Sequence, residues 1–176
     1  MPRPTLYIML GYPGSGKTTT AKLIADLTGA IHVWADVERV RQFGRPTHHE
    51  EESLELYQRL NAEVESLLAQ GFSVVFDTSF NHRSDRDLMR EIARRQQADV
   101  RIIQLDTPLE LAASRALSSD HADDNQHLDT MTPELFARVA GNLEPPMPDE
   151  EPLILDGTQI TREYVAEKLS AGARPA

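Results

Sequence analysis

The segment GYPGSGKT, from Gly11 to Thr18, matches the pattern G-x-x-x-x-G-K-[ST] at every fixed position. In such a loop the glycines let the backbone wrap around a phosphate, and successive N–H groups and the next helix N-terminus bind the anion. Lys17 is expected to bridge the β- and γ-phosphates of a nucleotide, and the Thr18 hydroxyl to coordinate Mg²⁺. The residues expected to bind the nucleotide here are Gly11, Pro13, Gly14, Ser15, Gly16, Lys17, Thr18 and Thr19.

Short apolar runs alternate with amphipathic segments along the 176 residues. The expected strands are Thr5–Leu10, Ile31–Ala35, Phe72–Phe76, Val100–Leu105 and Leu153–Leu155. The expected helices begin at Lys17, Glu50, Ser84, Pro108, Pro133 and Thr161, with capping boxes at Ser84 and Thr107. This alternation predicts an α/β chain with the three-layer fold of P-loop NTPases and kinases, a five-stranded parallel sheet with helices on both faces. Its length predicts one domain, 1–176.

The balance of charge limits the partners. There are 28 acidic residues against 18 basic ones, a formal net charge of −10, which disfavours a protein that coats nucleic acid. The absence of cysteine excludes disulfides, thiol nucleophiles and cysteine zinc sites. No apolar run approaches the ~20 residues of a membrane helix, and the first residues lack the form of a signal peptide. We therefore expect no membrane partner and a cytoplasmic location.

The phosphate loop occurs in several classes of protein, so other residues must indicate the reaction. A GTPase would need N-K-x-D, and none of the three lysines, Lys17, Lys22 and Lys168, follows an asparagine. A large ring ATPase is expected to have more chain after the core. These exclusions favour a kinase.

Two aspartates follow expected strands. Asp36 can accept the proton of an acceptor hydroxyl, with Arg39 one helical turn further on, or it can simply cap a short helix. Asp77 ends an apolar strand and is the second expected metal ligand, with a turn as the alternative. Arg83 and Arg86 come next, and either contact phosphate or belong to a solvated basic face.

These segments resemble a known family. GYPGSGKTTTAKLIA, WADVERVR and SVVFDTSFNHRSDRDLM, in that order, look like the P-loop kinases of the polynucleotide-kinase-like branch, over about residues 5 to 157. The resemblance implies that Asp36 is the general base, that Arg39 is the family's arginine three residues on, and that Asp77 is the aspartate of the third motif. Ser79 stands where the family usually has threonine.

The resemblance also implies a lid that closes over ATP. Between Arg115 and Arg138 the chain has no Lys or Arg and several acids, so we expect a polar, mobile lid near 116–132. Family lids often carry two or more arginines, whereas here Arg115 alone is expected to contact adenine or the phosphates, with Arg138 as a candidate helper. Arg115 thus joins Lys17, Asp36 and Arg39 as an expected catalytic residue.

The remaining candidates carry less information. His48, His49, His121 and His127 lack a metal-binding spacing and are interpreted as loop histidines. Trp34 either packs in the core or stacks on a nucleobase acceptor.

The sequence thus predicts a kinase that moves the γ-phosphoryl group of ATP, with Mg²⁺, to a hydroxyl of a small or nucleoside-like acceptor. A 5′-hydroxyl polynucleotide kinase and a non-catalytic, ATP-binding regulatory module are the alternatives.

Overall fold

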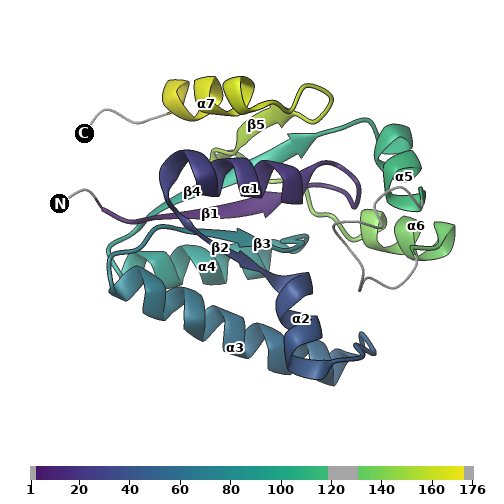
Figure 1. Ribbon diagram of the computed structural model, residues 1–176, viewed down its shortest axis with the longest axis horizontal. Coiled ribbons are helices and arrows are strands. Elements are labelled where there is room, and N and C mark those ends of the chain that lie inside the picture. Colours follow the sequence, from purple (N-terminus) through teal and green to yellow (C-terminus); the bar gives the residue numbers. More distant parts are fainter. Residues whose placement is uncertain (1–2, 119–130, 173–176) are drawn as a thin grey trace.

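A five-stranded, all-parallel sheet forms the centre of the molecule (Figure 1). The computed structural model describes residues 3–118 and 131–172. The strands, in the spatial order β2-β3-β1-β4-β5, are β1 Thr5–Leu10, β2 Ile31–Trp34, β3 Val74–Asp77, β4 Asp99–Asp106 and β5 Leu153–Asp156. The predicted α/β class and parallel sheet are confirmed.

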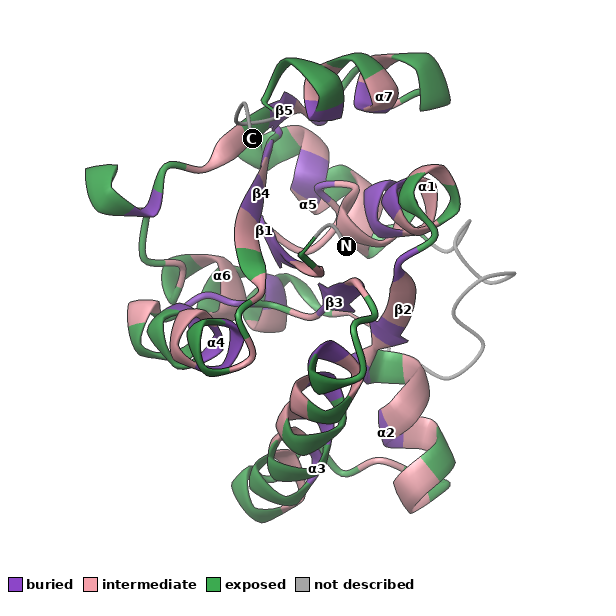
Figure 2. Ribbon diagram, turned by 90° about the vertical axis from the view of Figure 1, so that its left-hand side faces the viewer, coloured by how far each residue is buried: buried purple, intermediate pink, exposed green. Residues whose placement is uncertain are grey.

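Helices cover both faces of the sheet (Figure 2). They are α1 Lys17–Thr28, α2 Ala35–Phe43, α3 Glu50–Ala69, α4 Arg83–Arg95, α5 Leu109–Leu117, α6 Pro133–Gly141 and α7 Arg162–Ala171, with the short 3₁₀ helix η2 at Pro148–Glu150. One hydrophobic cluster packs α3 and α4 against side chains such as Leu6 and Ile8 of β1. A second packs α1 and α7 against Tyr7 and Met9 on the other face. The side chains of β1 therefore alternate between two cores, as a buried parallel strand requires.

The order of the strands places the site. Strand β1 lies between β3 and β4. From β1 the chain passes through α1 to β2, which lies on the β3 side of the sheet, whereas from β4 it continues to β5 on the opposite side. Open α/β sheets bind ligands at such a switch point, outside the carboxyl ends of the strands. Gly11, Asp77 and Asp106 lie at or just beyond the carboxyl ends of β1, β3 and β4.

Some local predictions were wrong. Helix α4 begins at Arg83 with His82 as its N-cap and no side-chain cap, so Ser84 forms no capping box. Helix α5 has Pro108 as its N-cap and no side-chain cap, and the Thr107 hydroxyl donates to the Ser15 carbonyl. Ala35, expected in β2, is the first residue of α2.

Other expectations concern the lid and the membrane. Most of the lid predicted near 116–132 lies outside the described residues. In 3–118 and 131–172, no helix has the length and apolar character needed to cross a membrane.

Candidate active site

The phosphate loop has the backbone shape that its glycines allow. Gly14 and Gly16 have φ of 76° and 102°, values that residues with a side chain rarely adopt, and Gly16 is the N-cap of α1. A Cβ atom on Gly14 would lie 2.2 Å from the carbonyl oxygen of Ala112 in α5. The loop therefore packs directly against the α5 backbone, and that contact requires a glycine.

Lys17 is held inside the loop. Its Nζ donates hydrogen bonds of 2.8 Å to the carbonyl oxygens of Gly11 and Tyr12. Loss of hydration lowers the pKa of Lys17 to about 8, although the charges of Asp77 and Asp36 act in the opposite direction. A bound polyphosphate would bring further negative charge, and this charge would stabilise the protonated form of Lys17.

The two predicted aspartates act on the same lysine. Asp36 is the second residue of α2, and Asp77 ends β3 with only 3% of its surface exposed. Asp36 is exposed to solvent. Nevertheless, desolvation by the surrounding protein and then the charge of Asp77 raise its pKa, while Lys17, Arg39 and His48 oppose the shift. The pKa of Lys17 therefore depends on the charges of both aspartates, and the pKa of Asp36 depends on the charges of Asp77 and Lys17.

Arg39 makes its side-chain hydrogen bonds with residues of α3. Its buried guanidinium donates to Glu52 Oε1 at 2.7 Å and to Ser53 Oγ at 3.2 Å, both near the start of α3. Glu52 also accepts hydrogen bonds from the Thr47 N–H and hydroxyl and from the His48 N–H. Arg39 therefore joins α2, which carries Asp36, to α3 and to the loop between the two helices.

Arg115 lies on the other side of the phosphate loop. Its Nη1 donates to the Gly157 carbonyl at 3.0 Å, and the Gly157 N–H donates to the Asp106 carbonyl at 2.9 Å. A Cβ atom on Gly157 would lie 1.7 Å from Thr107 Oγ1 and 2.7 Å from the Ser15 carbonyl oxygen. The β5–α7 loop therefore packs closely on the phosphate loop and brings Arg115 to its edge.

Two arginines of α4, Arg83 and Arg86, form ion pairs with other parts of the fold. Arg86 is fully buried and donates to Glu150 Oε1 at 2.6 Å and to the carbonyl oxygens of Phe80 and Asn81. Neither sequence interpretation of Arg86, phosphate contact or solvated face, was right. Arg83 does lie on the solvated face, where it pairs with Asp87 and Asp149.

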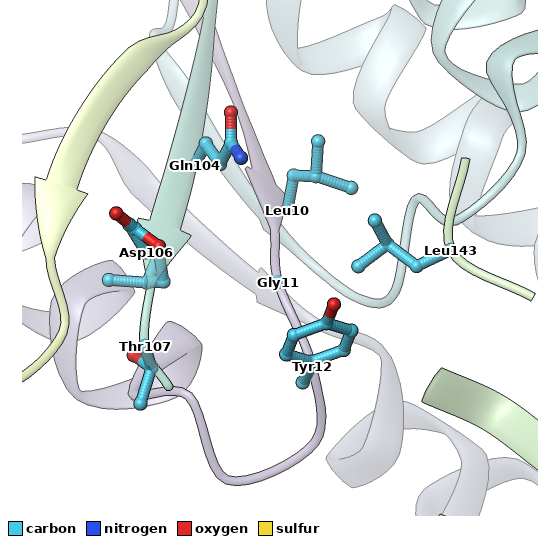
Figure 3. A pocket seen from close by; sticks show the side chains of 8 residues that line it. Leu10, Gly11, Tyr12, Gln104, Asp106, Thr107 and Leu143 are labelled. Atoms are coloured by element: carbon cyan, nitrogen blue, oxygen red, sulfur yellow. The ribbon is translucent and has the colours of Figure 1, made fainter. Parts of the chain in front are cut away.

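A small pocket opens beside the phosphate loop, in the crevice between β1 and β4 (Figure 3). Its volume is about 90 Å³, and it is lined by Leu10, Gly11, Tyr12, Gln104, Leu105, Asp106, Thr107 and Leu143. Gly11 and Tyr12 also supply the carbonyls that hold Lys17. Gln104 was not among the residues predicted from the sequence, although a single amide within the apolar run of β4 can indicate a polar site.

The donor atoms at the site suit a nucleotide with magnesium. Ser15 Oγ is buried and has no hydrogen-bond partner among the described atoms, as expected of a group that awaits a phosphate. Thr18 and Asp77 offer the hard oxygen ligands that Mg²⁺ prefers. Within 3–118 and 131–172 no group of three or more His, Cys, Asp or Glu forms a metal cage.

Known proteins resemble this chain over most of its length. A family model described as an AAA domain, AAA_33, matches residues 6–146. An unliganded sugar kinase from Janibacter sp. is 26% identical, with a TM-score of 0.67, over 97% of this chain and 94% of that one. A gluconokinase from Sinorhizobium meliloti 1021 is 23% identical, with a TM-score of 0.66, over 96% and 90%.

A further match comes from a larger assembly. A chain of the Pnkp1/Rnl/Hen1 RNA repair complex is 25% identical, with a TM-score of 0.65, over 81% of this chain and 45% of that one. Among curated proteins, none matches. The solved structures therefore share the fold with this chain, and they include kinases by name.

Proposed function

The chain belongs to the AAA_33 family of AAA domains, and from this premise we propose that it is a kinase that transfers the γ-phosphoryl group of Mg-ATP to a hydroxyl of a small or nucleoside-like acceptor. The observation that carries the proposal is the placement of Lys17, Asp77 and Asp36 just after or at the carboxyl ends of the neighbouring strands β1, β3 and β2. The charges of both carboxylates raise the pKa of Lys17, and the charge of Asp77 also raises the pKa of Asp36. Phosphoryl transfer needs this combination: a cation for the phosphates, a carboxylate for the metal and a second one for the acceptor.

Each group has one task. Lys17 and the loop N–H groups bind the ATP phosphates, and Thr18 and Asp77 hold the metal. Bound Mg²⁺ would neutralise negative charge on the β- and γ-phosphates. Asp36 orients the acceptor hydroxyl and takes its proton as the oxygen bonds to the γ-phosphorus and the bond to the β-phosphate oxygen breaks, releasing ADP. Because its pKa is raised, Asp36 is a stronger base than an ordinary aspartate.

Two arginines support this site from opposite sides. Arg39 fixes α2, and with it Asp36, through Glu52. Arg115 lies beside Gly157, a residue of the loop that packs on the phosphate loop. The polar side chains of Tyr12 and Gln104 in the β1–β4 crevice are the candidates to bind part of the acceptor.

A polynucleotide acceptor is the second candidate, favoured by the similarity to the RNA repair chain. The ion pairs of this chain disfavour a polynucleotide acceptor. Arg39, Arg83 and Arg86, which could otherwise contact its phosphates, are each paired with an acidic residue. Such an acceptor would bind through its phosphates, with a steep dependence on salt.

The test is ADP formation from Mg-ATP by the purified protein with pooled sugars, polyols and nucleosides. A 5′-hydroxyl oligonucleotide occupies a separate well, and Lys17→Ala is the blank. Turnover that requires one pool supports the proposal, and turnover with the oligonucleotide alone supports the second candidate. Tight ATP binding without ADP in any well would contradict both and favour the regulatory module.

A further inference from the structure

A histidine that plays no part in the proposed reaction lies against the proposed metal ligand. Nε2 of His32 is 3.1 Å from Oδ2 of Asp77, and the Asp77 side chain is 4% exposed. An ionised carboxylate can only accept hydrogen bonds, so with Asp77 ionised Nε2 carries the hydrogen and donates it. No other side-chain hydrogen bond to Asp77 is found among the described residues. His32 therefore holds one oxygen of this carboxylate.

The His32 ring is itself held in place. It stacks on the Trp34 ring with centroids 5.7 Å apart and an angle of 8° between the planes. Nζ of Lys22, from α1, lies 4.9 Å from the centroid of the same Trp34 ring. The Trp34 ring therefore contacts both the imidazole of His32 and the ammonium group of Lys22.

Strand register explains how these groups meet. In the parallel pair of β2 and β3, His32 lies opposite Val75, and Trp34 lies opposite Asp77. Residues two apart on a strand share a face, so His32, Trp34, Val75 and Asp77 all lie on one face of the sheet. Val75 packs in the cluster with α1, which identifies that face as the one beneath the helix of the phosphate loop. The imidazole thus reaches Asp77 diagonally across the two strands.

We propose that His32 is a positioning residue, which orients the Asp77 carboxylate toward the metal of the bound Mg-ATP. This inference rests on the proposed role of Asp77 as a metal ligand. Hydrogen-bond partners behind a metal-binding side chain fix its orientation, and their removal typically costs about 10- to 100-fold in metal affinity or activity. The stacked Trp34 ring restricts the imidazole to the orientation that the hydrogen bond needs.

Two substitutions separate this role from simple packing. His32→Phe keeps a ring that can stack on Trp34 and removes the hydrogen bond. His32→Gln can place an amide N–H near the position of Nε2 and restores a donor. Dissociation constants for ATP are measured by calorimetry, with Mg²⁺ and again with EDTA, because binding needs no acceptor and no turnover.

We expect His32→Phe to weaken ATP binding about 10-fold in Mg²⁺ and to leave it unchanged in EDTA, with His32→Gln closer to the original protein. Equal loss with and without Mg²⁺, or no loss at all, would overturn the proposal. Asp77→Asn is measured beside them. If Asp77→Asn leaves Mg-ATP binding intact, the metal role of Asp77 fails and the proposal with it, whereas absence of turnover with a preserved Mg²⁺ effect would fault only the proposed reaction.

Discussion

The Thr107 hydroxyl donates a buried hydrogen bond of 2.8 Å to the carbonyl oxygen of Ser15, 92 residues away in the chain. The bond joins the end of β4 to the phosphate loop. We expect Thr107→Val to lower the free energy of unfolding by about 1–3 kcal/mol, because a buried carbonyl loses its partner. ATP affinity should fall as well, since the loop loses a support. Denaturant unfolding and calorimetry check both, and Thr107→Ser, which keeps the hydroxyl, should retain most of each.

Two glycines with similar backbones allow a matched test of the loop. Gly14 and Gly29 have φ of 76° and 73°, but only Gly14 has a neighbour that a Cβ would strike. Both alanine variants should lose roughly 1–2 kcal/mol of stability from the left-handed backbone. Only Gly14→Ala should also lose ATP binding, because the loop must move away from α5. Equal ATP affinities in the two variants would contradict the described contact with Ala112.

The pH dependence of kcat/KM for ATP should be bell-shaped. Activity needs Asp36 ionised and Lys17 protonated. Because the Asp36 pKa is raised, the acid limb should lie above the pKa of an ordinary aspartate, 3.8. The alkaline limb should fall near pH 8, where free Lys17 loses its proton. Lys17→Arg should move the alkaline limb upward in any remaining activity, and an unmoved limb would assign it to another group.

Outside the site, the buried ion pair of Arg86 and Glu150 is expected to contribute strongly to the free energy of unfolding. Replacing Arg86 with Met leaves Glu150 buried without its partner, which typically costs about 3–5 kcal/mol. Burial alone would raise the pKa of Glu150, but the hydrogen bonds from Arg86 and from the Met147 N–H, together with the charges of Arg86 and Arg83, outweigh it and hold this pKa below 4.5. The stabilisation is therefore present above pH 4.5 and lost as the pH falls through the lowered value. Unfolding at pH 7 and pH 3 measures it, and the exposed Arg94→Met is the control, expected within about 0.5 kcal/mol.

Local patterns explain which features were predictable. Strands such as Thr5–Leu10 and the loop from Gly11 to Lys17 are encoded by neighbouring residues, so sequence alone indicated them. The positions of Thr107, Arg86 and His32 depend on partners 92, 64 and 45 residues away. No local pattern marks such pairs, because the parallel crossovers bring their members together only when the sheet has formed.

Arg39 illustrates the same limit within the site. Its spacing from Asp36 indicated a shared helix face, and α2 does carry both residues. Its contact with Glu52 depends on how α3 packs beside α2, which spacing within one helix does not encode.

Phosphate transfer by Asp36→Asn tests the central claim most directly. Label from [γ-³²P]ATP is followed into the acceptor identified in the pooled assay, and the ATP dissociation constant of each protein is measured alongside. We expect Asp36→Asn to bind Mg-ATP about as well as the original protein but to transfer phosphate roughly 10²–10⁴-fold more slowly. Transfer at the original rate, with ATP binding intact, would show that Asp36 is not the base and would contradict the account.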